Sequence, residues 1–439
     1  MPSPSTPRIA IVGSGPAGCY LATALARALP GCELTLFDRL ASPFGLVRYG
    51  VAADHQHTKA VTRQFERLFA TPGVRFAGDV SVGRDLTLDE LDAQYDAVVL
   101  ATGLSADRAL PIPGGDRPGV LGAGAITRAL NAHPAASPLP PLGSDIVIVG
   151  AGNVALDLLR FLVKDRSGYV ASDVADPVLD AYLADPALRI TVLSRSDAAH
   201  SKGDPQMIRE LSALPRGSYT AHGSLAAPEA ADRTVASRAA AYAELTAASR
   251  GAAPGPRVTL RFGAIPERVL GDTAVTGVAV RAGDEELVIP ATSVLTAIGF
   301  DADGTEASGE LPSALPADTG RLRPGRYRTG WAKRGPIGAI PENRACAKSV
   351  AEEIIADVSS GQLVPDPAKR GFAGLPAHVR ERAVSFAQWQ VLDEHERAGA
   401  APDRVRRKLT DHAAMVAIAR GATQTPAQPQ TQTQTQTPA

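Results

Sequence analysis

Short apolar runs alternate with amphipathic stretches along the first hundred residues. The runs at 8–13 ("RIAIVG") and 33–38 ("ELTLFD") have the length of buried strands, and residues 17–29 between them repeat apolar positions with a helical period. A third run at 95–103 ("YDAVVLATG") predicts another buried strand that ends in a turn. Strands separated by a helix are typical of βαβ units, which build parallel sheets. The pattern therefore predicts an α/β domain in this part of the chain.

A second α/β unit follows a loop rich in Pro and Gly at 110–120. Strands are predicted at 145–150 ("DIVIVG") and 189–195 ("RITVLSR"), with a helix at 153–164 between them. Residues 213–256 are rich in Ala, Ser, Gly and Arg, and predict a helix between loops. The pattern as a whole predicts an α/β fold with two units.

The last third of the chain has a different pattern. The stretches at 257–263 and 274–300 predict antiparallel strands that return to the second sheet. Two amphipathic helices are predicted at 377–400 and 404–420, which gives a helical C-terminal segment. The tail at 421–439 is polar and of low complexity, and it lacks the apolar surface that would offset the entropy of ordering, so we expect it to be disordered.

Composition and charge exclude several classes of protein. Of the 439 residues, 44% are apolar and 21% are charged, with a net charge of −1, which argues against nucleic acid as a bulk electrostatic partner. No apolar run approaches the roughly 20 residues that span a bilayer. The first strand begins at residue 8, which leaves no room for a signal peptide. We expect a cytoplasmic monomer without a membrane span.

The three cysteines, Cys19, Cys32 and Cys346, have neither CxxC nor metal-ligand spacing. A disulfide reductase needs two thiols that can exchange, and none lie close together in the sequence. We therefore predict three buried free cysteines and no metal site.

The first candidate site is "VGSGPAG", which places Gly13, Gly15 and Gly18 between a strand and a helix. In this spacing the first glycine makes the tight turn, the second lets the backbone approach a pyrophosphate, and the third lets the helix pack on the strand. Asp38 ends the next strand, where a carboxylate can bind the hydroxyls of an adenosine ribose. The turn, with Ser14 inside it, predicts a dinucleotide site; the alternative is an ordinary tight turn between strand and helix.

The second candidate site is "VGAGNVA", with Gly150, Gly152 and Ala155 again between strand and helix. The strand that follows ends at Arg195 and not at an acidic residue. A guanidinium pairs with a ribose 2′-phosphate, which a carboxylate would repel, so Arg195 indicates NADP(H); the alternative is a solvated surface arginine. Two dinucleotide sites in one chain imply hydride transfer between two cofactors, with FAD in the first site and NADP(H) in the second.

Several motifs resemble those of the adrenodoxin-reductase-type ferredoxin–NADP reductases. They are "GPAG" (15–18), "PFGLVRYGVAADH" (43–55), "ATG" (101–103), "GAGNVALD" (150–157) and "GWAKRGPIGAI" (330–340). The resemblance extends from about residue 8 to 420 and implies an enzyme that passes electrons from NADPH through FAD to a small acidic iron–sulfur ferredoxin, often for a cytochrome P450. It also implies an α/β fold with two Rossmann-like nucleotide-binding domains of the three-layer ββα/βαβ type. These are a discontinuous FAD domain, 8–107 plus 320–420, and an NADP domain, 108–319.

The same resemblance implies roles for individual residues. It places Ala17, Asp38, Leu46 and Val82 near the adenosine-diphosphate half of FAD; Trp331, Gly338, Ala339 and Ile340 at the flavin end; and Ala151, Gly152, Asn153 and Val154 around the NADP pyrophosphate. His55 would lie near the flavin ring, where it could supply or orient a proton, because its ordinary pKa is near neutrality. The alternatives are a histidine that only packs and, for Trp331, a core residue.

Two basic stretches are candidates for docking the acidic ferredoxin. Residues 321–334 carry six cations and no acid, beside the expected flavin motif, and residues 404–408 carry further cations. The alternative for each is a solvated face. Two other functions remain open: a flavoenzyme that acts directly on a small molecule, and a redox sensor that binds nucleotide without catalysis.

The chain departs from the family pattern at two positions near Arg195. Ser196 stands where the family usually has a second arginine, and Met207 stands where it usually has a glutamate. One charge-assisted phosphate contact is worth about 1.5–3 kcal/mol, so its loss corresponds to about ten- to a hundredfold in affinity. No acidic residue has replaced it to favour NADH.

We therefore predict that this protein distinguishes NADPH from NADH less sharply than its relatives do. Steady-state kinetics with both nucleotides measures the ratio of the two kcat/KM values. A preference for NADPH above about a thousandfold would contradict the prediction, since that ratio corresponds to about 4 kcal/mol of discrimination.

Overall fold

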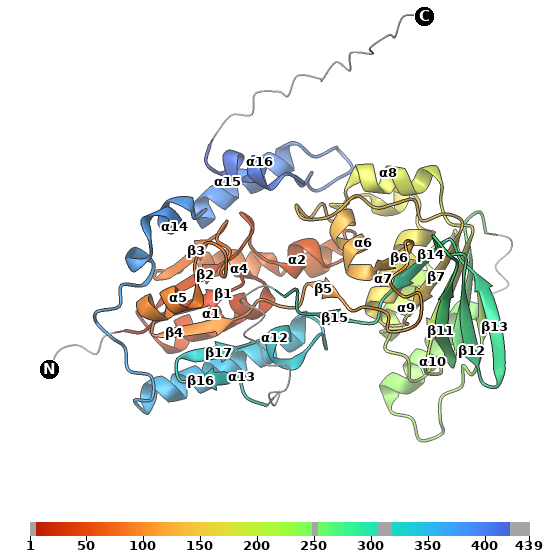
Figure 1. The fold of residues 1–439 in the computed structure, drawn as a ribbon, viewed down its shortest axis with the longest axis horizontal. Helices are drawn as coiled ribbons and strands as arrows, with labels where there is room; N and C mark the ends of the chain where they lie inside the picture. The colour runs from red at the N-terminus through yellow and green to blue at the C-terminus, as the bar shows by residue number, and fades with distance from the viewer. Residues whose placement is uncertain (1–5, 248–252, 305–317, 422–439) are drawn as a thin grey trace, which may run out of the picture.

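The computed structural model describes residues 6–247, 253–304 and 318–421. Figure 1 shows two lobes side by side, each built around a six-stranded sheet. Segments from both ends of the chain form the first lobe, and the middle of the chain forms the second. The tail that was expected to be disordered lies, from residue 422 on, outside the described residues.

The first sheet has the strand order β16-β17-β4-β1-β2-β3 and is parallel except for β16. Its strands are β16 Arg321–Arg323, β17 Arg326–Arg328, β4 Ala97–Leu100, β1 Arg8–Val12, β2 Glu33–Phe37 and β3 Val74–Ala77. Alternate residues of β1 point to opposite faces, as the pleat requires. Ile9 and Ile11 pack against α1 (Pro16–Ala28) and α13 (Ile340–Ser359), while Ala10 and Val12 pack on the other side with α5 (Leu88–Gln94).

The second sheet has the order β6-β14-β7-β8-β10-β9, and each of its strand pairs is parallel. Its strands are β6 Val120–Gly122, β14 Ser293–Thr296, β7 Asp145–Val149, β8 Arg189–Ser194, β10 Arg257–Phe262 and β9 Ser218–His222. One face is covered by α6 Ala123–Leu130, α7 Asn153–Val163, α9 Pro205–Ser212 and α10 Arg233–Ala247. A small antiparallel sheet covers the other: β11 Ala264–Leu270, β12 Gly277–Ala282 and β13 Glu285–Pro290. The predicted three-layer α/β class is confirmed.

The prediction of antiparallel strands returning to this sheet is partly wrong. β10 and β14 are parallel to their neighbours, and the antiparallel strands β11, β12 and β13 form a sheet of their own. The connection from β9 to β10 runs through α10, and a helical crossover joins parallel strands. The edge strand β9 was not predicted, since its sequence is short and polar.

The two C-terminal helices are also shorter than predicted. The first is divided into α14 (Ala377–Arg382) and α15 (Phe386–Ala398), because Ser385 caps α15 by accepting the Gln388 N–H at 3.3 Å. The second is helical only in α16 (His412–Ala419), while the preceding residues 404–411 run without helix along the second lobe. Within the described residues, none of the helices has the length and apolar content that a bilayer crossing requires.

All three cysteines are free, as predicted. Cys19 and Cys32 are buried, whereas Cys346 is only half-buried, and its Sγ lies 3.3 Å from the Gly330 backbone nitrogen, which donates to it. The described part of the chain contains no cluster of three or more ligand side chains suited to a metal ion.

Buried charges join the two lobes at one junction cluster, made of Lys59, Lys408, Asp173 and Asn131. Lys59 Nζ lies 2.7 Å from Asp173 Oδ1 and Lys408 Nζ lies 2.9 Å from Asp173 Oδ2. Both ammonium groups also donate to Asn131 Oδ1, at 2.6 and 3.1 Å. Lys59 and Lys408 come from the two halves of the first lobe, and Asp173 and Asn131 come from the second lobe. Three distant parts of the sequence therefore meet at one carboxylate.

The segment before α16 adds backbone contacts to the junction cluster. Val405 N donates to Ser172 O at 2.9 Å, and Ala171 N donates to Asp403 O at 2.8 Å. Arg404 is buried and its guanidinium lies 2.8 Å from Asp176 in α8 (Asp176–Ala184). In Figure 1 this blue segment runs along the top of the molecule to α8. The C-terminal region thus binds the second lobe directly.

Asp173 holds the charge balance of the cluster. Burial alone would raise the pKa of its carboxyl, but the ammonium groups of Lys408 and Lys59 outweigh burial and hold this pKa well below its usual range. The Asp173→Asn substitution would leave two buried ammonium groups without a counter-ion, which costs about 3–5 kcal/mol. We expect the free energy of unfolding in urea to fall by this amount. Asp272→Asn, at an exposed turn, is the control; equal small losses in both variants would contradict the expectation.

Candidate functional site

The first glycine turn is closed to any larger residue at two positions. Gly13 has φ +113°, and a Cβ there would lie 2.3 Å from Ala101 O. A Cβ on Gly18 would lie 2.1 Å from Gly13 O, so α1 packs directly on the turn. At Gly15 the nearest atom to such a Cβ is 4.0 Å away, which leaves the N-terminal side of α1 accessible. These are the steric roles that the spacing predicted.

A second loop faces this turn. Phe44 has φ +82°, a strained conformation for a residue with a side chain, and Gly45 has φ +47°. A Cβ on Gly45 would lie 3.1 Å from Gly15 Cα, so the two backbones approach closely. Leu46 begins α2 (Leu46–Tyr49) directly after this contact. The loop therefore places Leu46 beside the first turn.

Asp38 lies beside the first turn, at the end of β2. Ser14 Oγ donates to its Oδ2 at 2.5 Å, and Leu40 N donates to its Oδ1 at 3.0 Å. Burial raises the pKa of this carboxyl, and the hydrogen bonds from Ser14 and Leu40 oppose that rise. Val82 is buried in the same apolar cluster as Phe37, next to Asp38 in the chain. The Asp38 carboxylate is thus oriented by a hydrogen bond from the first glycine turn.

Trp331 lies close to the N-terminus of α1. It begins α12 (Trp331–Arg334), and a Cβ on the preceding Gly330 would lie 2.5 Å from Ala17 Cβ. Its indole is stacked on Phe300 with the ring centroids 5.5 Å apart. The buried Nε1 has no hydrogen-bond partner among the described residues. A buried donor without a partner fits a site that is completed by a cofactor with acceptor atoms.

The stretch Gly338–Ala339–Ile340 leads into α13. Gly338 is exposed with φ +82°, and Ile340 is the first residue of the helix. The resemblance places Ala339 at the flavin end, but its amide donates to Glu342 Oε2 at 2.8 Å. Glu342 therefore caps the helix through this amide.

The second glycine turn has the same geometry as the first. Gly150 has φ +120°, and a Cβ there would lie 2.5 Å from Ala297 O. Gly152 is the N-cap residue of α7, and the nearest atom to a Cβ there is Lys202 Cβ, at 3.7 Å. Ala151 and Ala155 are buried, while Asn153 and Val154, the first residues of α7, are only partly so or exposed. The N-terminus of α7 is thus accessible from outside, apart from Lys202.

Arg195 lies just beyond β8, at the edge of the sheet that carries this turn. Gly150 N donates to Leu193 O at 2.9 Å, which brings the end of β8 beside the turn. The Arg195 side chain is exposed and makes no ion pair with a described residue. The nearby His200 points to Asp197, with its Nδ1 2.8 Å from Asp197 Oδ1. Arg195 is therefore available to an anion.

His55 lies between the lobes, facing two carboxylates of the second lobe. Its Nδ1 is 3.7 Å from Asp157 Oδ1 and its Nε2 is 3.7 Å from Glu210 Oε2. The adjacent Asp54 binds two cations of α7, Arg160 at 2.5 Å and Lys164. These contacts place His55 against α7, the helix that begins at the second glycine turn.

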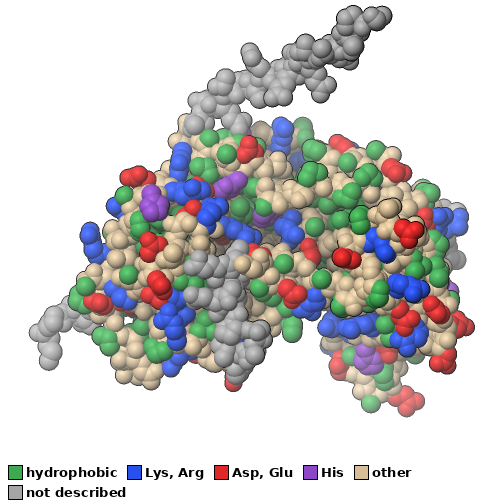
Figure 2. Space-filling view, viewed as in Figure 1, with side chains coloured by type: hydrophobic (Ala, Val, Ile, Leu, Met, Phe, Trp, Pro, Cys, Tyr) green, Lys and Arg blue, Asp and Glu red, His purple; other side chains and the backbone are tan. Residues whose placement is uncertain are grey.

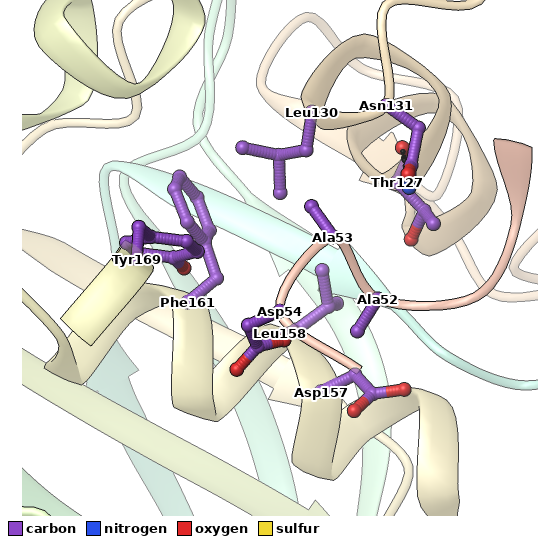
Figure 3. Close-up of a pocket in the computed structure, with 10 residues that line it drawn as sticks. All are labelled: Ala52, Ala53, Asp54, Thr127, Leu130, Asn131, Asp157, Leu158, Phe161 and Tyr169. Carbon is purple, nitrogen blue, oxygen red and sulfur yellow. Dashed lines mark hydrogen bonds between the residues drawn. The ribbon is translucent and has the colours of Figure 1, made fainter. Parts of the chain in front are cut away.

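A small cavity adjoins this group. Its volume is about 20 Å³, enough for a single water molecule. Figure 3 shows it between the loop at 52–54, α6 and α7, with Asp54 and Asp157 among its lining residues. The full lining is Ala52, Ala53, Asp54, Thr127, Leu130, Asn131, Asp157, Leu158, Phe161 and Tyr169. Because these walls are mostly apolar, the charged form of a titratable side chain beside the cavity is poorly solvated.

Two groups in this region have pKa values shifted towards the neutral form. Burial, helped by the charge of Asp54, raises the pKa of Asp157 to about 7. Burial likewise lowers the pKa of His55, although Asp54 and Glu210 oppose it. Perturbed titratable groups beside a cofactor site are typical of proton-handling positions.

Sequence reasoning identified His55 but missed its partners. Asp157, Arg160 and Lys164 are spaced three and four residues apart on one helix, which places them on the same face. That spacing was visible in the sequence. What it did not show is that Glu210 and the loop at Asp54 would come to this face, because Glu210 lies on a separate helix and Asp54 on the other lobe.

The fold and the two glycine turns define a flavin oxidoreductase that also binds a nicotinamide dinucleotide. Residues 7–212 match the family model for pyridine nucleotide-disulphide oxidoreductases. The chain is 40% identical to cindoxin reductase of Citrobacter braakii, over 95% of this chain and 92% of that protein. It is 30% identical to NADPH-ferredoxin reductase FprA of Mycobacterium tuberculosis, over 94% and 99%.

Structural similarity agrees with these matches. The solved structure of Mycobacterium tuberculosis FprA in complex with NADPH superimposes with a TM-score of 0.86 at 28% identity, covering 95% of this chain and 100% of that one. The chain belongs to the adrenodoxin-reductase-type ferredoxin–NADP reductases. It is accordingly an FAD- and NADP(H)-dependent oxidoreductase. The expected FAD and NADP(H) cofactors are confirmed.

The raised pKa of Asp157 has a measurable consequence. Between about pH 4, the pKa of an unfolded aspartate, and pH 7, the folded protein retains a proton that the unfolded chain releases. The free energy of unfolding should therefore fall as the pH rises through this window. Asp157→Asn cannot titrate, so we expect its stability to lose about 1–2 kcal/mol less than wild type between pH 4.5 and 8.

Urea unfolding of the flavin-loaded proteins across this pH range would measure the difference. Asp272→Asn, which is exposed and distant in sequence, should keep the wild-type slope. Parallel pH profiles for Asp157→Asn and wild type would show that this carboxyl titrates normally.

Proposed function

We propose that this protein is an NADPH:ferredoxin oxidoreductase that supplies electrons to a small acidic iron–sulfur ferredoxin, and through it to an oxygenase such as a cytochrome P450. Bound FAD accepts a hydride from NADPH and can release the two electrons singly. The observation that carries the proposal is the pair of glycine turns, one in each lobe, with His55 of the first lobe against α7 of the second. The relatives named as ferredoxin reductases support the acceptor.

We assign the FAD domain to residues 8–107 plus 320–420, and the NADP domain to 108–319. The shared sheet of β4 and β17 supports joining the two chain ends in one domain. FAD would be held by Gly13, Ser14, Gly15, Ala17, Gly18, Asp38, Leu46, Val82, Trp331, Gly338, Ala339 and Ile340. NADP(H) would be held by Gly150, Ala151, Gly152, Asn153, Val154 and Arg195. Since Glu342 engages the Ala339 amide, that contact requires Glu342 to turn away.

His55 is the candidate catalytic residue in this proposal. Its neighbours Asp157 and Glu210 can hold its ring. Burial lowers the pKa of His55, whereas the pKa of Asp157 is raised to about 7, where a proton can be exchanged near neutral pH. Asp54, fixed by Arg160 and Lys164, sets the position of the adjacent His55. The chain would thus bring one titratable side chain to the place where the two cofactors meet.

Several cations of the two basic runs are not available to the docking surface that their sequence indicated. In the first run, Arg326 and Arg328 are buried in β17, and Arg326 lies 2.6 Å from Asp92. In the second, Arg404 and Lys408 are buried at the lobe junction. Positive and negative side chains are interspersed over the face in Figure 2. These cations are buried because their elements pack inside, which leaves Arg323 and Arg407 as the exposed cations of the two runs.

Direct action on a small molecule is less well supported. The relatives of this chain are named for ferredoxins and not for small organic substrates. The three unpaired thiols fit a reducing compartment, and we propose that the protein acts in the cytoplasm. The described residues contain no paired cysteines that would support disulfide reduction.

Purified flavoprotein, NADPH, cytochrome c and a ferredoxin test the proposal. We expect NADPH to bleach the yellow chromophore and cytochrome c to be reduced only when the ferredoxin is added. NADPH consumption that depends on a small molecule without ferredoxin would favour a substrate-specific flavoenzyme. No bleaching would indicate a non-catalytic nucleotide-binding protein.

A further inference from the structure

One loop covers the second glycine turn, and a single charged side chain projects from its middle. This turn-covering loop comprises residues 198–204, between β8 and α9. Ser201 and Gly203 are buried, whereas Lys202 between them is exposed. The alternation directs the lysine outwards while its two neighbours anchor the backbone.

The turn-covering loop is held in place from both sides. Arg238 in α10 donates from Nε to Gly203 O at 2.6 Å and from Nη1 to Ala199 O at 2.7 Å. Asp204 N donates to Asn153 Oδ1 at 2.7 Å, which ties the loop to the first residue of α7. The position of Lys202 is therefore fixed by its neighbours, and not by contacts of its own ammonium group.

The anchored loop lies directly on the glycine turn. A Cβ on Gly203 would lie 3.2 Å from Ala151 O, and a Cβ on Gly152 would lie 3.7 Å from Lys202 Cβ. Lysine carries its charge on a flexible stem of four carbons with three rotatable donors. An ammonium group that starts this close to Gly152 can reach an anion bound at the N-terminus of α7. Lys202 makes no ion pair with any described residue, so its charge is available.

The need for such a cation follows from the residues around Arg195. Ser196 is uncharged, and its carbonyl accepts the Gly263 N–H at 3.1 Å, so it brings no positive charge to the site. His200 is paired with Asp197. Arg195, at the end of β8, and Lys202, above the turn, are thus two separated cations at one dinucleotide site.

We propose that Lys202 binds the pyrophosphate of the nicotinamide dinucleotide, which rests on the proposal that the second turn holds NADP(H). The pyrophosphate is common to NADPH and NADH, whereas only NADPH has the 2′-phosphate. Lys202 therefore adds affinity for both nucleotides, and Arg195 alone selects between them. The missing second arginine is compensated in binding strength but not in selectivity.

Two fragments of the nucleotide separate these roles. Adenosine 2′-monophosphate has the 2′-phosphate without the pyrophosphate, and ADP-ribose has the pyrophosphate without the 2′-phosphate. Calorimetric titration of the flavin-loaded protein measures the affinity of each. We expect Lys202→Met to weaken ADP-ribose by about ten- to a hundredfold and leave adenosine 2′-monophosphate within about twofold. Arg195→Met should do the reverse.

Lys348→Met is the matched control, because Lys348 is 75% exposed on α13 in the first lobe. It should bind both fragments like wild type, and all variants should retain flavin. If both fragments bind wild type and Lys202→Met leaves ADP-ribose unchanged, the inference about Lys202 is wrong. If Lys202→Met lost affinity only for adenosine 2′-monophosphate, the inference would be wrong as well. If neither fragment nor NADP⁺ binds wild type, the proposed function itself fails.

Discussion

The carboxylate of Asp173 is the point on which the arrangement of the two lobes depends. It neutralises Lys59 from the first part of the chain and Lys408 from the last, and all three side chains are buried. A buried charge cluster is weak evidence for stability, but it tolerates only a narrow range of geometries, because a separated member is left without a partner. Hydride transfer requires reacting atoms at near-contact distance. The junction cluster therefore gives two nucleotide sites on separate lobes a defined separation.

The same principle explains the distribution of cations in this chain. Arg326, Arg404 and Lys408 looked in the sequence like members of exposed basic runs, yet each is buried against an acidic side chain. A run of charged residues in the sequence does not show whether the side chains are exposed. Their burial depends on how the helix, strand or loop that carries them packs. What remains free at the nucleotide site is small: Arg195 and Lys202, each held in place by backbone contacts of its neighbours.

Local geometry could be predicted from sequence where a steric rule acts on a few adjacent residues. Gly13, Gly18 and Gly150 lie in turns that no side chain fits, and Asp38 ends the next strand as expected. The prediction failed where a distant segment decided the outcome. Residues 404–411 have a helical pattern, but Arg404 and Lys408 pair with the second lobe, and the backbone there bonds to Ser172. The partners of His55 were missed for the same reason.

The shared sheet of the first lobe has a consequence for biosynthesis. On the ribosome, β1 to β4 emerge early, but β17 and the apolar face of α13 that covers α1 emerge only after the whole second lobe. The face of α1 that α13 covers in the folded protein must therefore stay exposed while the central lobe folds. We expect chaperones to bind the growing chain at this exposed segment. We also expect that synthesis which stops before α13 yields a fragment that aggregates.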